Sequence, residues 1–313
     1  MDSRELGETG WSVPVLCTGT SALGSFPAQY GYEVDEQTAV SAIVTSVEQG
    51  FTFIDTSNEY GGGASELRIG RALERLGGVL DGVLIATKVD PLPGSDDFSG
   101  DRVRRSVEES RSRLGMETLP LVYLHDPEKI GFDASMAPGG PVEALLELQA
   151  AGVIGALGVA GGPIEMELEF LRTGAFQVVL SHNRYTLVDS SAAVLVEECA
   201  ERGVGFVNAA PFGGGMLVKG PDQVPTYCYA PVNDAVLTRV RAIETACRNH
   251  DVPMAAVALQ FATRDDRVAS TVVGMSRPQR FAEIQKLLET PVPAELWSAI
   301  EPLVREGRAG VLA

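Results

Sequence analysis

Three short segments of this sequence each end an apolar run with a side chain that carries or exchanges protons. The segment "FIDTSNEYGGGASE", residues 53–66, holds Asp55 and Tyr60 before three successive glycines. The segments "GVLIATKVD" and "LPLVYLHD" carry Lys88 and His125. A turn explains the glycines, because glycine adopts backbone angles that other residues avoid. It does not explain the acid, the phenol, the amine and the imidazole, which together indicate proton chemistry.

These four side chains suit proton exchange with an alcohol or a carbonyl while hydride moves through a separate group. A free tyrosine has a pKa near ~10, too high for efficient exchange at neutral pH. A neighbouring ammonium favours the tyrosinate, so we expect Lys88 to lower the pKa of Tyr60 below that value. Asp55 would keep Lys88 in place and charged. His125 would hydrogen-bond the substrate oxygen or share a proton with Tyr60.

The chain alternates predicted strands and helices eight times. The strands are continuous apolar runs, which is typical of a parallel sheet covered by helices. Eight such units favour an α/β fold, a closed (β/α)8 TIM barrel forming one domain over residues 1–313. We expect a short hairpin over 4–14 and extra helices over 252–264 and 293–304. The predicted strands cover 13–20, 51–56, 82–90, 119–126, 153–161, 176–182, 204–211 and 268–275; the predicted helices cover 35–50, 64–77, 101–115, 140–152, 163–174, 190–203, 233–250 and 278–289.

This arrangement would bring the four side chains together. In such a barrel the chemistry lies at the mouth formed by the carboxyl ends of the strands. Asp55, Lys88 and His125 close the second, third and fourth predicted strands, and neighbouring strands lie about 5 Å apart. Tyr60 follows the second strand, in a loop that the glycines allow to fold back over the mouth. An isolated Asp is often a helix cap, but three consecutive strands that end in ionisable residues predict a site.

Composition narrows the classes of partner. Formal net charge is −17, from 25 basic and 42 acidic residues. This excludes nucleic acid and anionic membranes as expected partners, because both require clustered Lys and Arg. We expect a small-molecule substrate and a monomer or homodimer.

The cysteines and the apolar runs point to a cytoplasmic protein. Cys17 and Cys199 sit in apolar periodic segments, so we expect buried free thiols. None of the four cysteines shows metal-like spacing, and we expect no metal site. No signal peptide is visible at residues 1–10, and no uncharged apolar run reaches the roughly 18 residues of a membrane span.

Three motifs in order resemble the aldo-keto reductase superfamily. They are "FIDTSNEYGGGASELRIGRAL", "IATKVD" and "LVYLHD", and the resemblance extends from about residue 4 to residue 285. It implies a (β/α)8 barrel that binds NAD(P)(H) without a Rossmann domain. The missing G-x-G-x-x-G after the first strand agrees with this. The superfamily's catalytic tetrad falls on Asp55, Tyr60, Lys88 and His125.

The resemblance also implies cofactor and substrate contacts. Phe212 stands near the position of a usual stacking tyrosine, and His182 near that of a usual glutamine; Ala160 and Gly161 replace a Ser-Asn pair. The substrate contacts implied are Tyr60, His125 and Phe26. The cofactor contacts implied are Thr20, Asp55, His182, Ala210, Pro211, Phe212, Gly213, Gly214, Gly215, Gly274, Ser276, Arg280 and Glu283.

The same comparison favours NAD over NADP. Gly274 and Met275 replace a Lys-Ser pair that is typical of NADP-preferring members. One cation for the 2′-phosphate is therefore missing. Arg277 or Arg280 would have to replace it if the chain used NADP.

Four further segments resemble the aldose 1-dehydrogenase branch of the superfamily. They are "LGETG", "NEYGGGASE", "SHNRYTLVD" and "NAAPFGGGML". That branch includes L-fucose, D-threo-aldose and L-galactose dehydrogenases and pyridoxal 4-dehydrogenase. The implied reaction oxidises the C1 hemiacetal hydroxyl of an aldose to a lactone, with Tyr60 as the base and hydride passing to NAD(P)+.

Three alternatives remain at the level of the sequence. A pyridoxal 4-dehydrogenase or a general aldehyde or ketone reductase would use the same tetrad. A Schiff-base aldolase would also place a lysine at the end of a barrel strand, but without a dinucleotide. A non-catalytic, cofactor-binding regulatory subunit would not need the tetrad intact.

Overall fold

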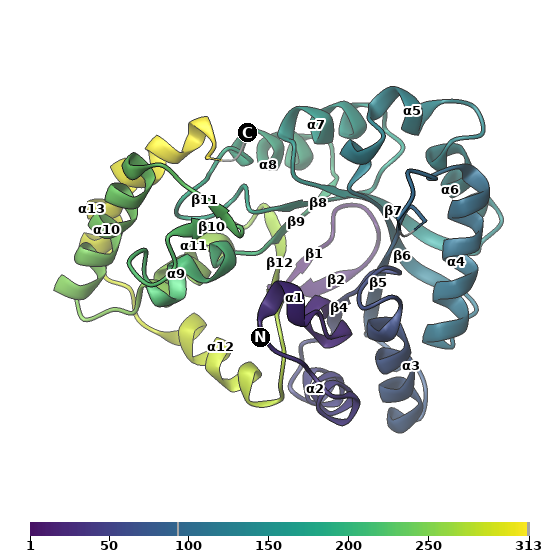
Figure 1. The fold of residues 1–313 in the computed structure, drawn as a ribbon, viewed down its shortest axis with the longest axis horizontal. Coiled ribbons are helices and arrows are strands. Elements are labelled where there is room, and N and C mark those ends of the chain that lie inside the picture. Colours follow the sequence, from purple (N-terminus) through teal and green to yellow (C-terminus); the bar gives the residue numbers. More distant parts are fainter. Residues whose placement is uncertain (93, 312–313) are drawn as a thin grey trace.

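Eight parallel strands close into a barrel in which the last strand pairs with the first. The computed structural model describes residues 1–92 and 94–311. Strand β12 pairs with β3 on one side and β9 on the other, and the others follow in chain order (Figure 1). These strands are β3 (Leu16–Gly19), β4 (Phe53–Asp55), β5 (Leu84–Val89), β6 (Leu119–His125), β7 (Ile154–Gly161), β8 (Val178–His182), β9 (Gly205–Ala209) and β12 (Val268–Gly274). Each lies within a segment predicted as a strand, so the predicted (β/α)8 fold is confirmed.

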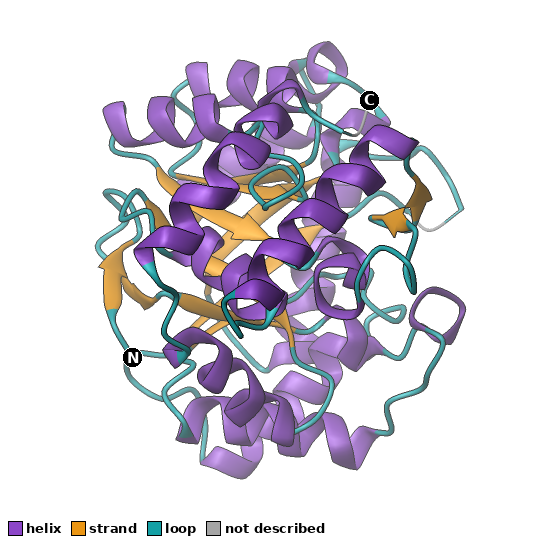
Figure 2. Cartoon of the chain, turned by 90° about the vertical axis from the view of Figure 1, so that its left-hand side faces the viewer, coloured by secondary structure: helices purple, strands orange, loops and turns teal. Residues whose placement is uncertain are grey.

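Helices surround the strands on the outside of the barrel (Figure 2). The predicted Asp cap is present, because Asp35 accepts a hydrogen bond from the amide of Thr38 at 2.9 Å. The helices after the first six strands and after the last are α2 (Glu36–Glu48), α3 (Ala64–Leu76), α4 (Gly100–Leu114), α6 (Pro141–Ala150), α7 (Ile164–Arg172), α8 (Ala193–Glu201) and α12 (Gln279–Glu289). Short elements in the loops are α1 (Pro27–Tyr30), α5 (Phe132–Met136), α9 (Met216–Lys219) and the hairpin of β10 (Thr226–Tyr227) and β11 (Ala230–Pro231).

One helix assignment from the sequence was wrong. The sequence predicted α10 (Asp234–Asn249) as the barrel helix after β9 and α11 (Met254–Thr263) as an addition. Instead α11 packs against β12, and α10 packs on α11 and α13 (Ala294–Arg305), at the left edge of Figure 1. The reason lies in composition: α11 is apolar on most of its surface, which is typical of a buried helix.

The N-terminal hairpin closes the amino end of the barrel. Strands β1 (Ser3–Glu5) and β2 (Ser12–Pro14) pair antiparallel, as predicted. Leu6 and Val13 are buried and pack with the side chains inside the barrel. The amide of Glu8 donates to the carbonyl of Gly203, just before β9, at 2.9 Å. The opposite end of the barrel is left for the loops that carry the chemistry.

Side-chain alternation along three strands places the tetrad. Phe53, Ala86 and Tyr123 lie inside the barrel. Because strand side chains alternate between faces, the residues two positions further along point the same way. Those residues are Asp55, Lys88 and His125, at the carboxyl ends of β4, β5 and β6.

Two predictions about the rest of the chain can be compared with the structure. Cys17 and Cys199 are buried free thiols, as predicted. Among the described residues, no helix combines the length and the apolar character needed to cross a bilayer.

Candidate active site

Lys88 lies at the centre of the candidate active site. Its side chain is only 2 % exposed. Its ammonium donates to Asp55 Oδ1 at 2.6 Å, to the carbonyl of Thr56 at 2.7 Å and to the hydroxyl of Tyr60 at 3.3 Å. An ammonium has three donors, so these three bonds fix its position. The structure therefore brings Asp55, Tyr60 and Lys88 together as predicted.

Burial and charge compete over the pKa values of this group. Burial disfavours the ammonium of Lys88, but the adjacent Asp55 carboxylate outweighs it and raises the pKa of Lys88. Burial also raises the pKa of Tyr60, and the opposing effect of Lys88 does not outweigh it. The prediction that the Tyr60 pKa falls below about 10 was therefore wrong for this geometry. It left out the cost of burying a phenolate.

His125 is held by a carboxylate that the sequence analysis did not select. Nδ1 of His125 lies 2.5 Å from Asp90 Oδ1. Asp90 Oδ2 accepts from the hydroxyl of Ser57 and, at 3.2 Å, from the amide of Glu59. A carboxylate only accepts hydrogen bonds, so Nδ1 of His125 carries the donated proton. This leaves Nε2 for other partners.

The Asp90–His125 pair favours the charged imidazole. Burial disfavours that form, but the carboxylates of Asp90 and Asp126 outweigh it and raise the pKa of His125. Burial likewise acts to raise the pKa of Asp90, but His125 outweighs it and lowers that pKa. The rings of Tyr60 and His125 lie edge to face, with centroids 6.0 Å apart. All four predicted catalytic residues therefore converge at one mouth of the barrel.

One of the three glycines after Tyr60 is required by a close backbone contact, and a second lies against a flexible side chain. Gly61 has φ 65°, and a Cβ there would lie 2.1 Å from the carbonyl oxygen of Gly24 in the loop after β3. A Cβ on Gly63 would lie 2.4 Å from the guanidinium carbon of Arg113. Gly62 has φ 61° but open space around it. The glycine run thus allows the Tyr60 loop to pack directly against its neighbours.

Thr20 and Phe26 lie in the loop after β3 and have different environments. Thr20 is fully buried, and its hydroxyl donates to the carbonyl of Asp55 at 2.8 Å and accepts from Ser65 at 2.8 Å. Its hydroxyl therefore ties two loops together, and the cofactor contact implied for Thr20 stays a prediction. Phe26 is half-buried and precedes α1. Its substrate contact stays a prediction.

The predicted cofactor loop after β9 is a compact turn. Ala210 has φ 59°, and the amides of Gly213 and Gly215 donate to the carbonyls of Ala210 and Phe212. These two amides are engaged within the loop and are not free donors for a cofactor phosphate. Pro211 and Gly213 are buried, and Gly214 is exposed. The role of the loop in cofactor binding stays a prediction.

The predicted cofactor residues after β12 contact that loop. The Arg280 guanidinium lies 5.8 Å from the centre of the Phe212 ring. Glu283 pairs with Arg277 at 2.7 Å and with Arg280 at 3.2 Å. Ser276 is half-buried next to these groups in the chain, and Gly274 is exposed at the end of β12, where a Cβ would meet no atom within 4 Å.

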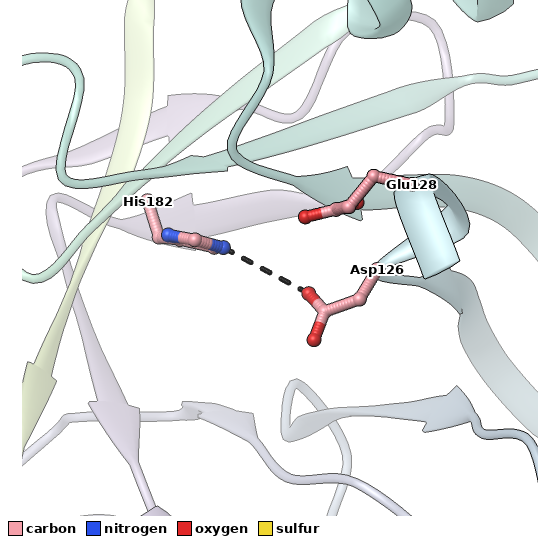
Figure 3. Close-up of side chains that lie close together, drawn as sticks. All are labelled: Asp126, Glu128 and His182. Carbon is pink, nitrogen blue, oxygen red and sulfur yellow. Dashed lines mark ion pairs between the residues drawn. The ribbon is translucent and has the colours of Figure 1, made fainter. Parts of the chain in front are cut away.

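His182 lies beside two acids from the loop after β6 (Figure 3). Its Nε2 is 3.8 Å from Asp126 Oδ1, and Asp126 Oδ1 is 3.6 Å from Nε2 of His125. Ligand-type atoms of Asp126, Glu128 and His182 all lie within 4.8 Å of one another. The sequence analysis predicted a cofactor contact for His182 and no metal-type cluster, because residues 126, 128 and 182 show no recognisable spacing.

The residues missed by the sequence analysis share one feature. Asp90, Asp126 and Ser57 each lie one to two residues from a selected catalytic residue or strand end. Extending the strand-end argument by two positions would have selected Asp90, which follows Lys88 in "IATKVD". Nothing in the sequence indicated that Asp126 meets His182, because that contact joins strands that are not neighbours.

The glycine contacts generate a matched pair of substitutions. Gly61→Ala and Gly62→Ala both place alanine at positive φ, which costs about 1–2 kcal/mol of stability each. Only Gly61→Ala also collides with Gly24, so it should displace Tyr60 and lower kcat by roughly 10-fold or more. Urea unfolding and steady-state kinetics of both variants measure this. Equal kcat values in the two variants would contradict the packing argument.

The Asp90–His125 pair generates a pH-dependent prediction. In Asp90→Asn the pKa of His125 should fall, because the carboxylate that favours its charged form is gone. A histidine whose pKa is raised by folding stabilises the protein fully below its unfolded pKa of about 6.5, and that stabilisation disappears as pH rises through the raised value. The variant should therefore lose about 1–3 kcal/mol near pH 6 and less at alkaline pH.

Urea unfolding across pH measures the stability difference, and NMR titration measures His125 directly. The chain has only three histidines, so the signals are few and His250 serves as an internal reference. A stability loss independent of pH, with an unmoved His125 titration, would mean that Asp90 acts only through packing.

Comparison with known proteins agrees with the fold and identifies the family of the chain. The model of the Aldo/keto reductase family matches residues 15–305. The chain is 30% identical to D-threo-aldose 1-dehydrogenase of Pseudomonas sp. over 318 residues, covering 93% of this chain and 94% of that protein. It is 28% identical to L-galactose dehydrogenase of Arabidopsis thaliana, covering 97% of this chain and 94% of that protein. Pyridoxal 4-dehydrogenase of Microbacterium luteolum is 26% identical, with 96% of each chain covered.

A solved structure has the same fold. The aldo-keto reductase AKR11C1 from Bacillus halodurans (holo form) superposes with a TM-score of 0.79 at 24% identity, over 98% of this chain and 99% of that chain. The family model spans the barrel strands, and the related dehydrogenases each cover more than nine-tenths of the chain. The chain therefore belongs to the aldo/keto reductase family, and it is an NAD(P)-dependent oxidoreductase.

Proposed function

We propose that this enzyme oxidises the C1 hemiacetal hydroxyl of an aldose to the lactone, with hydride transfer to NAD(P)+. The observation that carries the proposal is the contact of the Tyr60 hydroxyl with the ammonium of Lys88 at 3.3 Å, at the barrel mouth. The similarity to an aldose and a galactose dehydrogenase supports a sugar as the substrate.

Tyr60 is the proposed proton acceptor. Its oxygen accepts a hydrogen bond from Lys88, so the tyrosinate, which is the form of Tyr60 that can take the proton, is stabilised by an ammonium already in place. Asp55 keeps that ammonium charged and oriented. As the C1 hydroxyl loses its proton to Tyr60 and C1 loses hydride, the C–O bond becomes the lactone carbonyl.

His125 is the proposed hydrogen-bond donor to the substrate oxygen. Asp90 holds the imidazole through Nδ1 and favours its charged form, in which Nε2 also carries a proton. A donor at Nε2 would position the C1 oxygen toward Tyr60, because the two rings lie edge to face. The two charged pairs thus have separate roles: one tunes Tyr60, and the other orients the substrate.

The residues after β9 and β12 fit a dinucleotide. The contact of Arg280 with Phe212 joins the two loops into one surface, and Gly274 leaves open space beside it. The amino end of α12 follows the carboxyl end of β12 and so lies at the same end of the barrel, where the helix dipole favours a phosphate. When bound, the nicotinamide group supplies the acceptor for hydride. Phe212, Ser276 and Arg280 are the residues we propose to hold the dinucleotide.

The state of Lys88 argues against two alternatives. A Schiff-base aldolase needs a neutral amine as nucleophile. Here Asp55 raises the pKa of Lys88, and all three of its donors are engaged. A regulatory subunit would not need four converging catalytic side chains. Pyridoxal oxidation remains the rival, since a pyridoxal 4-dehydrogenase is 26% identical.

A substrate panel tests the proposed function. L-Fucose, L-galactose, D-arabinose and pyridoxal are each assayed with NAD+ and NADP+, and the products are identified by mass spectrometry. An aldose should give the highest kcat/KM and yield the aldonolactone. Turnover of pyridoxal alone would refute the proposed substrate class and leave the tetrad chemistry intact.

Tyr60→Phe should lower kcat by roughly 10²- to 10⁴-fold, the usual contribution of acid–base help. The fold and cofactor binding should survive, because only one hydroxyl is removed from a ring that keeps its packing. Steady-state kinetics and a fluorescence titration with NAD+ measure both. An unchanged kcat would exclude Tyr60 as the proton-exchanging group.

NAD+ should be used at least as well as NADP+. Both arginines that could grip a 2′-phosphate are paired with Glu283. Glu283→Gln should therefore raise the ratio of kcat/KM for NADP+ over NAD+ several-fold, a modest change because exposed ion pairs are weak.

Glu289→Gln on the last turn of α12 serves as the control for Glu283→Gln, since it makes the same charge change on the same helix. A strong preference of the unmodified enzyme for NADP+ would contradict the prediction. So would an equal effect of the two substitutions on the NADP+ to NAD+ ratio.

A further inference from the structure

A polar cluster beside the tetrad has no part in the proton transfer described above. It consists of Asp126 and Glu128, from the loop after β6, and His182, at the end of β8 (Figure 3). Asp126 Oδ1 lies 3.6 Å from Nε2 of His125. The cluster therefore begins where the candidate active site ends, at the nitrogen that would face the substrate oxygen.

Asp126 has an unused position for a hydrogen bond. Its Oδ1 atom is buried and has no hydrogen-bond partner. The separations of 3.6 Å and 3.8 Å from the Nε2 atoms of His125 and His182 both exceed the ~3.2 Å limit of an ordinary N–H···O bond. Buried polar atoms nearly always have partners, and an unpaired one is costly. The gap has the size for a polar group that bridges the carboxylate and an imidazole.

A second unpaired oxygen lies on the far side of Glu128. Glu167 on α7 is 1 % exposed, and its Oε2 accepts from Ser181 at 2.8 Å while its Oε1 has no partner. A Cβ at Gly161 would lie 3.3 Å from Glu128 Oε2 and 3.8 Å from Glu167 Oε1. Glu128 Oε2 and Glu167 Oε1 thus both lie next to Gly161, which has no side chain. The cluster and its neighbour Glu167 contain oxygen atoms that have no hydrogen-bond partner in the protein.

Several constraints hold Asp126 in this place. Its backbone adopts the left-handed conformation (φ 45°, ψ 54°), which is uncommon for a residue other than glycine. Its amide donates to the carbonyl of Ala160 at 2.8 Å. Lys129 lies 3.5 Å from Oδ2, on the other oxygen of the carboxylate. Oδ1 is therefore kept toward the two imidazoles.

We propose that Asp126, Glu128 and His182 form a subsite for the ring hydroxyls of a neutral polyol, next to the carbon that Tyr60 and His125 act on. His182 is thereby assigned to the substrate instead of to the cofactor contact that the resemblance implies. The proposal rests on the proposed function for the identity of the reacting hydroxyl. A sugar hydroxyl both donates and accepts, so it bonds to a carboxylate oxygen and an imidazole N–H together. Two carboxylates would repel sugar phosphates and sugar acids, so the subsite selects uncharged aldoses.

Binding of non-oxidisable sugars tests the subsite separately from catalysis. Methyl L-fucoside and methyl L-galactoside have no free C1 hydroxyl, so they bind without reacting. Their affinity for the enzyme saturated with NAD+ is measured by isothermal titration calorimetry. The variants are Asp126→Asn and Glu128→Gln, which keep size and remove charge. Asp133→Asn on α5 and Glu165→Gln on α7 make the same charge changes at exposed positions and serve as controls.

Asp126→Asn and Glu128→Gln should each weaken glycoside binding roughly 10-fold or more, the range for a hydrogen bond to a charged group. The two controls should stay within about twofold of the unmodified enzyme, and affinity for NAD+ should not change in any variant. Absence of glycoside binding in the unmodified enzyme, or equal affinities in all five proteins, would overturn the subsite.

Two further measurements separate the possible failures. If the enzyme binds the glycosides but oxidises no aldose, the proposed function fails while the subsite stands. If it oxidises aldoses and the subsite variants do so unchanged, the subsite is wrong and the function stands. A ZnCl₂ titration identifies the remaining alternative: tight zinc binding that Glu128→Gln abolishes, without glycoside binding, would make the cluster a cation site.

Discussion

The buried ion pair of Lys88 and Asp55 is the interaction on which the site depends. Both side chains are 5 % exposed or less, so each would be costly to bury as a lone charge. Replacing such a pair by apolar residues is often neutral or stabilising in proteins, whereas removing one partner typically costs 3–5 kcal/mol. Stability alone therefore does not explain the pair. The pair is explained by its chemical consequence, because it holds the Lys88 ammonium in a fixed position next to the Tyr60 phenol.

A second buried carboxylate, that of Asp90, holds the imidazole of His125 in the same way. Asp90 holds His125, which would meet the substrate, as Asp55 holds Lys88, which contacts Tyr60. The two pairs come from three consecutive strands, β4, β5 and β6, and their spacing follows from the parallel register of the barrel. Only Tyr60 comes from a loop. Its position depends on the contact of Gly61 with Gly24, a backbone contact that no side chain could replace.

The parts of this picture that follow regular geometry could be predicted from the sequence. Continuous apolar runs and capped helices predicted all eight barrel strands and seven of the helices around them, and alternation along the strands explains why Asp55, Lys88 and His125 converge. The exchange of roles between α10 and α11 was missed because both follow the same strand, and only burial distinguishes them. The sequence pattern alone does not show how much of the surface of each helix packs against the core.

The remaining differences concern the surroundings of individual side chains and amides, which a local sequence pattern does not show. Lys88 was expected to lower the Tyr60 pKa, and it does act in that direction, but the burial of the hydroxyl acts more strongly. The sequence also does not show that the amides of Gly213 and Gly215 are engaged in their own turn. The meeting of Asp126 with His182 joins the ends of β6 and β8 across the mouth, beyond the reach of sequence spacing.

The account's central claim is that the charge on Lys88 makes Tyr60 the proton acceptor. The most direct measurement is the pH dependence of kcat/KM for aldose oxidation in the unmodified enzyme, in Lys88→Met and in Asp55→Asn/Lys88→Met. The double variant removes both charges, so that no lone carboxylate is left buried. A primary isotope effect at C1 checks that hydride transfer limits the rate.

The account predicts that the alkaline rise in kcat/KM moves to higher pH in both variants, because loss of the ammonium raises the pKa of Tyr60 further. Profiles that superimpose on that of the unmodified enzyme would contradict it, and would reduce Lys88 to a structural residue.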